Sequence, residues 1–300
     1  MLDKEIFLEK YKLREVYDKS GLSWDMLGDI YEDYVQNQYE NLQKLANEIV
    51  FMLEEQRKKC EDDNLNIGLG TIHTIFGRAK NPEHLIEKII RKVGSEDSAK
   101  YSKISKKKYL EIITDLIGIR MLVLAKEDWK IADTLIRMNF HEFYEPPRAY
   151  VCYGDRKIFD EKLLYVDYTN KGYRSQHYIV EYHGYRAEIQ VRTLAEEVHG
   201  EFDHRTRYPY KIDNKFLVRY SKILSKDISM IDDLISTCLT VDERMLDKLD
   251  QNFKEDRYEN WSKSQISYQQ EKNTEIESAD AKDEFNDIKA LINAKLLSRK

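Results

Sequence analysis

Two β-rich runs joined by a single His-Gly dipeptide constrain the fold of this chain more than any other feature. Residues 177–182 and 185–192 are rich in the residue types that favour strands. A two-residue connection of this kind forms a tight hairpin, so the two strands are expected to be antiparallel. Two further short apolar runs, residues 117–124 and 162–167, are the other candidate strands. The sequence therefore predicts a mixed or antiparallel sheet of four to five strands.

Long amphipathic helices are expected before the sheet. Apolar residues recur about every 3.6 positions from Ser23 to Cys60, with one break at Gln38, and Ser23 is a suitable N-cap. A shorter helix is expected to open at Asn81-Pro82, because proline is favoured in the first turn. Glycine (11) and proline (4) are scarce, which favours long helices over a turn-rich all-β fold.

Helical patterns return after the sheet. Thr193 followed by Glu196 fits a capping box, and a helical apolar stripe runs from Phe216 to Cys238. A last amphipathic segment spans residues 285–296. In the first of these segments, Leu194, Val198 and Phe202 fall on one helical face, so a helix is expected directly after the sheet.

Charge is unevenly distributed along the chain. The whole chain has a formal net charge of −6, but residues 77–108 contain ten Lys and Arg against four Asp and Glu. Such a run is usually a solvated face, yet it also suits a phosphate-rich ligand. No stretch is long and apolar enough to span a membrane, and the three cysteines lack metal-ligand spacing. We therefore expect a cytoplasmic protein with free thiols and no membrane contact.

The strand at residues 185–192 has two faces of opposite character. Because strand side chains alternate, Glu188, Gln190 and Arg192 stand in a row about 6.6 Å apart, and three apolar residues form the other face. The polar row predicts one wall of a cleft. The alternative is a solvent-facing edge of an antiparallel sheet.

A second acid, Asp115, lies where a helical pattern gives way to the strand that contains Arg120. Two carboxylates on neighbouring strands suit Mg²⁺ bound to a nucleoside triphosphate, because that ion takes few protein oxygens and keeps phosphate and water as its other ligands. The alternative is that Asp115 only caps a helix end.

Arg78, Lys80 and Lys88 cluster around the helix opened by Pro82, where charge and the helix N-terminus both favour phosphate oxygens. No glycine-rich phosphate loop is present, so side chains would hold the phosphates. The alternative is that they are ordinary surface cations.

A tyrosine follows a glycine between two of the candidate strands. The stretch of residues 171–177 places Tyr173 after Gly172 and among basic residues. A ring so placed can stack on a nucleobase, which is worth roughly 1–3 kcal/mol. The alternative is an ordinary loop tyrosine in a chain that has 21 of them.

Several motifs in one order resemble the synthetase domain of the RelA/SpoT family, and in particular its small alarmone synthetases. They are GRAK with Lys88 ten residues after Arg78, then DLIGIR, KGYRSQH, EIQVRT and DHRTRYPY, over about Gly77 to Tyr210. The resemblance implies an α+β fold with a mixed five-stranded sheet flanked by helices. It also implies a synthetase core at residues 64–212, between helical regions at 1–63 and 213–300, with a polar linker at about 260–282.

The resemblance further implies a pyrophosphokinase that transfers the β,γ-pyrophosphate of ATP to the ribose 3′-hydroxyl of GDP or GTP. Asp115 and Glu188 are then expected to bind Mg²⁺, and Glu188 to take the proton of the acceptor hydroxyl. The expected ATP contacts are Arg78, Lys80, Lys88 and Arg120. Tyr173 is expected to stack on the acceptor base, and the residues expected near it are His177, Gln190 and Arg192.

Two other functions stay open at this point. A toxic branch of the small synthetases is similar but modifies the 3′ end of tRNA and is neutralised by an antitoxin protein, and the lysines from Lys100 to Lys108 suit that acceptor. An inactive nucleotide-sensing or RNA-binding module is the remaining alternative. The helical extensions are expected to bind a partner, either an antitoxin or a second copy in a homo-oligomer.

Overall fold

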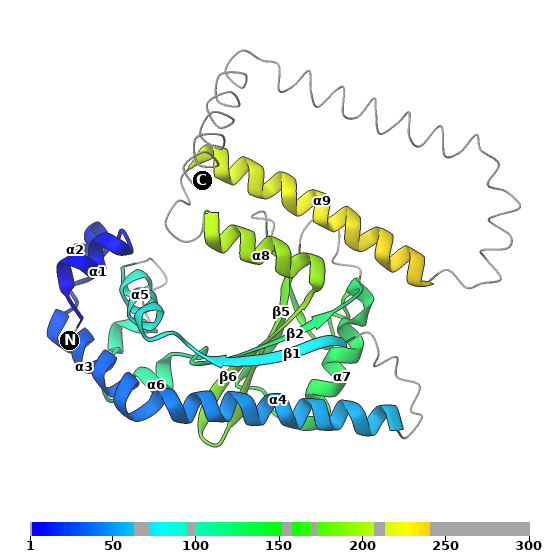
Figure 1. Cartoon of the computed structure of the whole chain (residues 1–300), viewed down its shortest axis with the longest axis horizontal. Coiled ribbons are helices and arrows are strands. Elements are labelled where there is room, and N and C mark those ends of the chain that lie inside the picture. The colour runs from blue at the N-terminus through cyan, green and yellow to red at the C-terminus, as the bar shows by residue number, and fades with distance from the viewer. Residues whose placement is uncertain are drawn as a thin grey trace, which may run out of the picture. The chain divides into compact units, whose positions relative to one another are not determined.

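The predicted hairpin lies at the centre of a six-stranded mixed sheet in the computed structural model (Figure 1). The strand order is β1-β2-β6-β5-β3-β4. The strands are β1 (Ile72–Ala79), β2 (Ile117–Val123), β3 (Glu145–Val151), β4 (Tyr165–Tyr168), β5 (Ser175–Tyr182) and β6 (Tyr185–Thr193). The structure describes residues 2–62, 72–94, 100–151, 158–169, 173–206 and 214–240.

Strand pairing confirms the hairpin and the mixed character of the sheet. β5 and β6 pair antiparallel up to Tyr182 opposite Tyr185, and β2 pairs parallel with β6. The connecting residues His183 and Gly184 have φ angles of 49° and 78°. Two positive φ angles in succession are what a two-residue hairpin turn requires, because they match the twist of the flanking strands.

The strand count was underestimated, because β1 and β3 were not predicted. Pro146 and Pro147 in β3 mimic a loop signal, since proline cannot donate to a strand ladder. The structure accommodates both prolines at a shift in the β3–β5 register between Glu145 and Arg148. The weak candidate strand at residues 162–167 is β4, displaced to Tyr165–Tyr168.

The apolar face of the sheet packs on helices. Ile117, Ile119 and Met121 of β2 are fully buried on this face. Helices α4 (Tyr39–Asp62) and α7 (Trp129–Asn139) both contact β2. A Cβ atom built at Gly77 would lie 3.0 Å from the Ala46 carbonyl oxygen, so α4 approaches β1 closely there. Figure 1 shows α4 on one side of the sheet, and α8 and α9 on the other.

The long N-terminal helix is confirmed in extent, with one change of geometry. α3 (Trp24–Asp33) continues through a π-helical segment, Tyr34–Gln38, into α4. The π segment ends at the predicted break, Gln38. The helix starts after Ser23 as predicted, but the Ser23 side chain makes no capping hydrogen bond. Two short helices, α1 (Lys4–Lys10) and α2 (Arg14–Ser20), precede it.

The helix predicted at Asn81-Pro82 is α5 (Pro82–Val93), and the Asn81 side chain accepts from the backbone amides of Glu83 and His84. The remaining short helical segments before β3 are η3 (Tyr101–Lys103), α6 (Tyr109–Ile112) and η4 (Lys126–Asp128).

The capping box that opens α8 (Leu194–Thr206) is confirmed. The Thr193 amide donates to Glu196 Oε2 over 2.9 Å, and the Glu196 amide donates to Thr193 Oγ1 over 3.0 Å. The helix is confirmed, but its apolar residues do not form its buried face, because Val198 is 62% exposed. The residues that α8 buries are Glu196, His199 and Gly200. The buried face is polar because it covers the polar face of the sheet.

Helix α9 (Lys215–Thr240) also buries a polar face. Its apolar stripe was correctly read as helical, but Ile231 and Leu234 are about half exposed, at 46% and 51%. The buried residues of α9 are mainly serines and one acid, namely Ser221, Ser225, Ile228, Ser229, Asp232 and Ser236. Small polar side chains let α9 lie close to the charged groups beneath it.

No helix in the described part of the chain is long and apolar enough to cross a membrane. Cys238 is a free, exposed thiol. Residues up to Leu239 form one compact unit. The polar linker at 260–282 and the amphipathic segment at 285–296 lie outside the described residues, and the division into three regions stays a prediction.

Candidate active site

The strand register brings the predicted site residues onto one face of the sheet. Arg120 on β2 lies opposite Gln190 on β6, which lies opposite His177 on β5. Residues opposite one another on paired strands point to the same side. The predicted wall is therefore the middle of a polar sheet face and not a solvent-facing edge, because β6 has a neighbour on each side.

The next row of the same face has an open centre. Gly118 on β2 lies between Arg78 on β1 and Glu188 on β6. A Cβ atom built at Gly118 would meet nothing closer than the Arg78 carbonyl oxygen, at 3.9 Å. Because glycine has no side chain, space is left between the guanidinium and the carboxylate.

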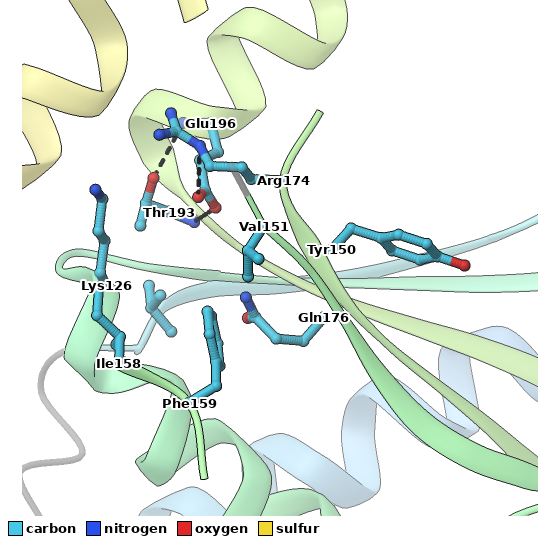
Figure 2. A pocket seen from close by; sticks show the side chains of 10 residues that line it. Lys126, Tyr150, Val151, Ile158, Phe159, Arg174, Gln176, Thr193 and Glu196 are labelled. Atoms are coloured by element: carbon cyan, nitrogen blue, oxygen red, sulfur yellow. Dashed lines mark hydrogen bonds and ion pairs between the residues drawn. The ribbon is translucent and has the colours of Figure 1, made fainter. Parts of the chain in front are cut away.

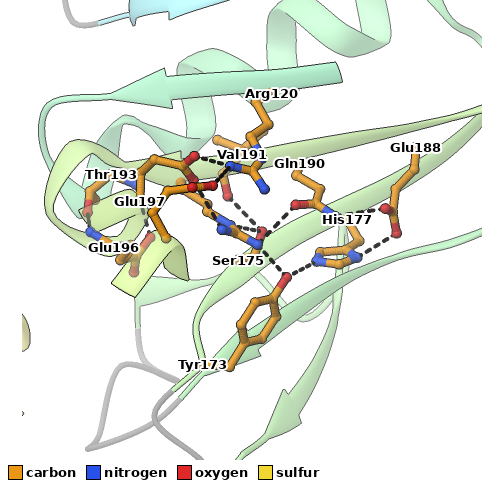
Figure 3. A network of polar contacts seen from close by, with 12 residues as sticks. Arg120, Tyr173, Ser175, His177, Glu188, Gln190, Val191, Thr193, Glu196 and Glu197 are labelled. Atoms are coloured by element: carbon orange, nitrogen blue, oxygen red, sulfur yellow. Dashed lines mark hydrogen bonds and ion pairs between the residues drawn. The ribbon is translucent and has the colours of Figure 1, made fainter. Parts of the chain in front are cut away.

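Five side chains of the site form a closed ring of hydrogen bonds (Figure 3). Glu188 Oε1 pairs with His177 Nδ1 over 2.9 Å, and His177 Nε2 pairs with the Tyr173 hydroxyl over 2.8 Å. Arg192 Nη2 donates to the Tyr173 oxygen over 2.8 Å and to Gln190 Oε1 over 3.0 Å. Gln190 Nε2 closes the ring by donating to Glu188 Oε2 over 2.7 Å.

The charges in this ring favour a protonated His177. Burial lowers the pKa of His177, but Tyr173 and Glu188 outweigh burial and raise it to about 9. Both ring nitrogens therefore donate at neutral pH. Burial alone would raise the pKa of Glu188, but His177 holds it below its usual range. Glu188 is thus an ionised carboxylate with a fixed orientation.

Tyr173 has a more constrained position than a loop tyrosine would have. Its hydroxyl is held by His177 and Arg192, and the Arg192 guanidinium lies 5.0 Å from its ring centroid. The ring of Tyr150, which the sequence did not single out, contacts it at 5.9 Å between centroids. Gly172 lies outside the described residues, so its part in placing the ring stays a prediction.

Arg192 is the hub that joins the ring to helix α8. Its Nε donates to Ser175 Oγ over 3.2 Å, and its Nη1 donates to Glu197 Oε2 over 3.1 Å. A Cβ atom at Gly200 would lie 2.6 Å from Nη1, so α8 sits directly on the guanidinium. These contacts turn the donors of Arg192 toward protein groups.

Two acids of α8 contact Arg120, and neither was predicted from the sequence. Glu197 Oε1 pairs with Arg120 Nη1, and Glu201 Oε1 lies 3.0 Å from the same nitrogen. Their spacing of four residues puts them on one helical face. That spacing was the available signal, but it does not reveal which strand the helix covers.

Asp115 is enclosed by two lysines. Lys80, which directly follows β1, donates to Asp115 Oδ2 over 2.8 Å. Lys88 on α5 places its Nζ 2.8 Å from Oδ1. Burial would raise the pKa of Asp115, but the two ammonium groups outweigh burial and hold it well below its usual range. The alternative reading of Asp115 as a helix cap is therefore wrong.

Asp115 and Glu188 suit a metal ion whose remaining ligands are phosphate oxygens and water. Among the described residues, no group of three or more His, Cys, Asp or Glu side chains is arranged to hold a metal ion. The negative charge of Asp115 nevertheless acts to raise the pKa of Glu188, so the two carboxylates influence each other. Mg²⁺ commonly takes one or two carboxylates together with phosphate oxygens. The residues present fit such an ion.

A buried ionic cluster joins α8 and α9, and Figure 2 shows three of its members, Arg174, Thr193 and Glu196. Arg174 Nε lies 3.3 Å from Glu196, and Arg174 Nη2 lies 3.8 Å from Asp232 of α9. Thr193 Oγ1 donates to Asp232 Oδ2 over 3.1 Å. Arg174 and Thr193 directly follow the ring residues Tyr173 and Arg192 in the chain. The small cavity next to this cluster encloses about 10 Å³, which is room for about one water and far too small for a nucleotide.

Comparison with known proteins places this site in a family region. Residues 77–213 match the model described as the region found in RelA / SpoT proteins. This span agrees with the resemblance read from Gly77 to Tyr210. No curated protein matches the sequence of the chain.

Solved structures that match the chain include a GTP pyrophosphokinase family protein from Streptococcus pneumoniae, at 20% identity and a TM-score of 0.47, covering 65% of this chain and 88% of that one. Small alarmone synthetase 1 from Bacillus subtilis matches at 21% identity and a TM-score of 0.47, covering 69% of this chain and 96% of that one. The same synthetase bound to its product pppGpp matches at 21% and 0.44, covering 66% and 92%. By its sequence match, the chain contains the region that RelA and SpoT proteins share.

Proposed function

We propose that this protein is a pyrophosphokinase that transfers the β,γ-pyrophosphate of ATP to the ribose 3′-hydroxyl of GDP or GTP, which makes a (p)ppGpp alarmone. One observation carries the proposal. Within the RelA/SpoT region, a single polar sheet face holds an oriented, ionised carboxylate, Glu188, next to a second acid, Asp115, and a set of cations.

In the proposed reaction, the 3′-oxygen of the acceptor attacks the β-phosphorus of ATP. A bond forms between these atoms, the bond from the β-phosphorus to the α,β-bridging oxygen breaks, and AMP leaves. Such a reaction depends on positioning and on charge neutralisation. Arg78, Lys80, Lys88 and Arg120 are the proposed phosphate contacts, and Arg78 flanks the open position at Gly118.

Glu188 is the proposed general base. It removes the proton of the 3′-hydroxyl as that oxygen attacks, and the charged His177 keeps Glu188 ionised until then. Asp115 and Glu188 would hold Mg²⁺, which when bound would neutralise charge on the phosphates. General-base catalysis typically contributes 10²–10⁴-fold to rate.

The proposed acceptor site lies around Tyr173. Its ring would stack on the acceptor base, and His177, Gln190 and Arg192 support it through the hydrogen-bonded ring. Stacking of this kind tolerates any base, so the choice of guanosine would depend on further contacts.

The 3′ end of tRNA is the second candidate acceptor, and one observation favours it. Lys103, Lys106, Lys107 and Lys108 are all exposed and close together in sequence, from the last residue of η3 to the residue before α6. A tRNA lays many phosphates on a protein surface, and each neutralised phosphate steepens the salt dependence of binding by nearly one unit. An antitoxin protein belongs to this candidate, whereas a second copy bound through the helical extensions is compatible with either acceptor.

One experiment distinguishes the candidates. ATP labelled at the γ-phosphate is incubated with the protein and either GDP, GTP, ATP or deacylated tRNA in separate reactions. We expect label on GDP or GTP, no label with Glu188→Gln, and little change when the four lysines are replaced by glutamine. Label on tRNA alone that vanishes in the four-lysine variant would overturn the nucleotide acceptor. Label on none of them would overturn the pyrophosphokinase itself.

A further inference from the structure

The two proposed metal ligands are both engaged by protein groups. Asp115 is only 17% exposed, and Lys80 and Lys88 reach it from two different elements. Both oxygens of Glu188 are likewise in contact, one with His177 and the other with Gln190. In this arrangement each of the four carboxylate oxygens already has a protein partner.

Lys88 covers the carboxylate oxygen of Asp115 that Lys80 leaves uncovered. Lys80 donates a hydrogen bond to Oδ2 over 2.8 Å, and Lys88 Nζ lies 2.8 Å from Oδ1. Both oxygens of this carboxylate therefore face an ammonium group. A metal ion bound by Asp115 would have to take the place of one of these two cations.

The lysines have a stronger alternative partner in the proposed substrate. A triphosphate carries more negative charge than one carboxylate, and a phosphate anion forms charge-assisted bonds with lysine. Lys88 lies on α5, whose N-terminal turn also favours anions. Lys80 follows Arg78 by two residues, and Arg78 lies opposite Gly118, which has no side chain.

We infer that the metal site is closed in the free protein and is opened by the triphosphate. Phosphate oxygens take Lys80 and Lys88 away from Asp115, and Asp115 is then free to accept a metal ion. The inference rests on the proposed function, because it takes the ligand to be a nucleoside triphosphate. It makes triphosphate and metal binding mutually dependent, with the ion pairs as the coupling element.

The coupling has two separate consequences for binding. Removing Lys88 opens Asp115 to metal without any nucleotide, and removing the Asp115 charge releases the lysines to phosphate without any metal. The test therefore has two arms, and each arm omits one of the two ligands. In each arm the dissociation constant is measured on the full chain by titration calorimetry, without turnover.

In the first arm, Mn²⁺ is titrated without nucleotide. We expect Lys88→Gln to bind Mn²⁺ about tenfold more tightly than wild type, as for an ion pair worth roughly 1.4 kcal/mol. Arg91→Gln is the matched control, because it removes one positive charge from the same helix but from a residue paired with Glu87. It should bind Mn²⁺ as wild type does.

In the second arm, inorganic tripolyphosphate is titrated in the presence of a chelator. We expect Asp115→Asn to bind tripolyphosphate about tenfold more tightly than wild type, and Glu87→Gln, which removes a negative charge from α5, to behave as wild type. An Asp115 that acts only as a metal ligand would give no effect here, because no metal is present.

The inference is overturned if both Lys88→Gln and Asp115→Asn melt as wild type does and yet leave these two dissociation constants within twofold. The inference is also overturned if Arg91→Gln and Glu87→Gln tighten binding as much as Lys88→Gln and Asp115→Asn do. The effect would then follow from net charge alone. Failure of the proposed function looks different: label transfer to every acceptor would be absent while both binding arms behave as expected.

Discussion

At the residue scale, the main feature is that Glu188 is oriented by a ring and is not simply exposed on a strand. His177 supplies a positive charge to it, and Gln190 supplies a second hydrogen bond. The base proposed for the reaction is therefore fixed before any substrate binds, which reduces the reorganisation needed in the transition state. The other two members of the ring, Tyr173 and Arg192, contact Glu188 only through His177 and Gln190.

Loss of the His177 charge should shift the pH dependence of activity. His177→Gln removes the charge that keeps the pKa of Glu188 low, so that pKa should rise. The acidic limb of the kcat profile should move to higher pH, and kcat at neutral pH should fall by about 10²-fold. His141→Gln, at an exposed histidine, is the control. An acidic limb that stays in place would show that His177 does not tune the base.

Loss of the Tyr173 hydroxyl should cost stability. From the sequence, only the ring of Tyr173 was expected to matter, so Tyr173→Phe would be nearly silent. In the structure the hydroxyl accepts from His177 and Arg192, and each unsatisfied buried donor costs about 1–3 kcal/mol. Urea denaturation should show a loss of at least about 1 kcal/mol for Tyr173→Phe. Tyr150→Phe, which removes the hydroxyl of the neighbouring tyrosine, is the control. If Tyr173→Phe were as stable as Tyr150→Phe, the Tyr173 hydroxyl would not stabilise the ring.

Single residues of the site were predictable because strands alternate. Glu188, Gln190 and Arg192 were placed on one face by that rule alone, and Asp115 by its position before a strand. The ring was not predictable, because it depends on the register between β5 and β6 and on side-chain orientation. The sequence contains no local signal for either.

At the element scale, helix α8 lies over the site with its acids facing the cations of the sheet. Glu197 and Glu201 contact Arg120, which is a proposed phosphate contact. An incoming phosphate must therefore compete with these carboxylates. The helix itself was predictable from its capping box, but its buried face was not, because the partner surface is polar and an apolar pattern search points the wrong way.

Removing one of these acids should strengthen ATP binding. Glu201 is 48% exposed, and exposed ion pairs are worth about 0.2–1 kcal/mol. Glu201→Gln should therefore bind a non-hydrolysable ATP analogue about two- to fivefold more tightly, as measured by titration calorimetry. Glu142→Gln, at an exposed acid outside α8, should have no effect. Weaker binding by Glu201→Gln would mean that Glu201 helps to hold the nucleotide.

At the scale of the whole molecule, the ionic cluster around Asp232 joins α9 to the sheet. Lys126 contributes to the same junction by pairing with Asp233 over 2.8 Å and by donating to Ser229 over 3.2 Å. The existence of α9 followed from its apolar periodicity. Its orientation did not, because its buried serines carry no hydrophobic signal and its exposed apolar residues dominate the pattern.

The junction should make stability depend on pH. Burial and the neighbouring Glu196 raise the pKa of Asp232 to about 7, opposed by Thr193, Arg174 and Lys126. A carboxyl whose pKa is raised in the folded state stabilises at low pH, and this stabilisation is lost as pH rises from about 4 through 7.

Asp232→Asn cannot ionise, so it should gain stability relative to wild type as pH increases. The difference in free energy of unfolding between variant and wild type, measured in urea, should grow by on the order of 1 kcal/mol or more between pH 4.5 and 7.5. Asp227→Asn, at an exposed acid of the same helix, should show no such growth. A constant difference for Asp232→Asn would mean that Asp232 titrates normally.

The central claim is that the chain moves pyrophosphate as one unit, and the nucleotide by-product tests it most directly. ATP and GDP are incubated with wild-type protein and with Glu188→Gln, and the adenine nucleotides are separated and quantified. The account predicts that wild type forms one AMP for each GDP that receives pyrophosphate. Glu188→Gln should form AMP at least about 10²-fold more slowly. ADP in place of AMP, or undiminished AMP from Glu188→Gln, would contradict it.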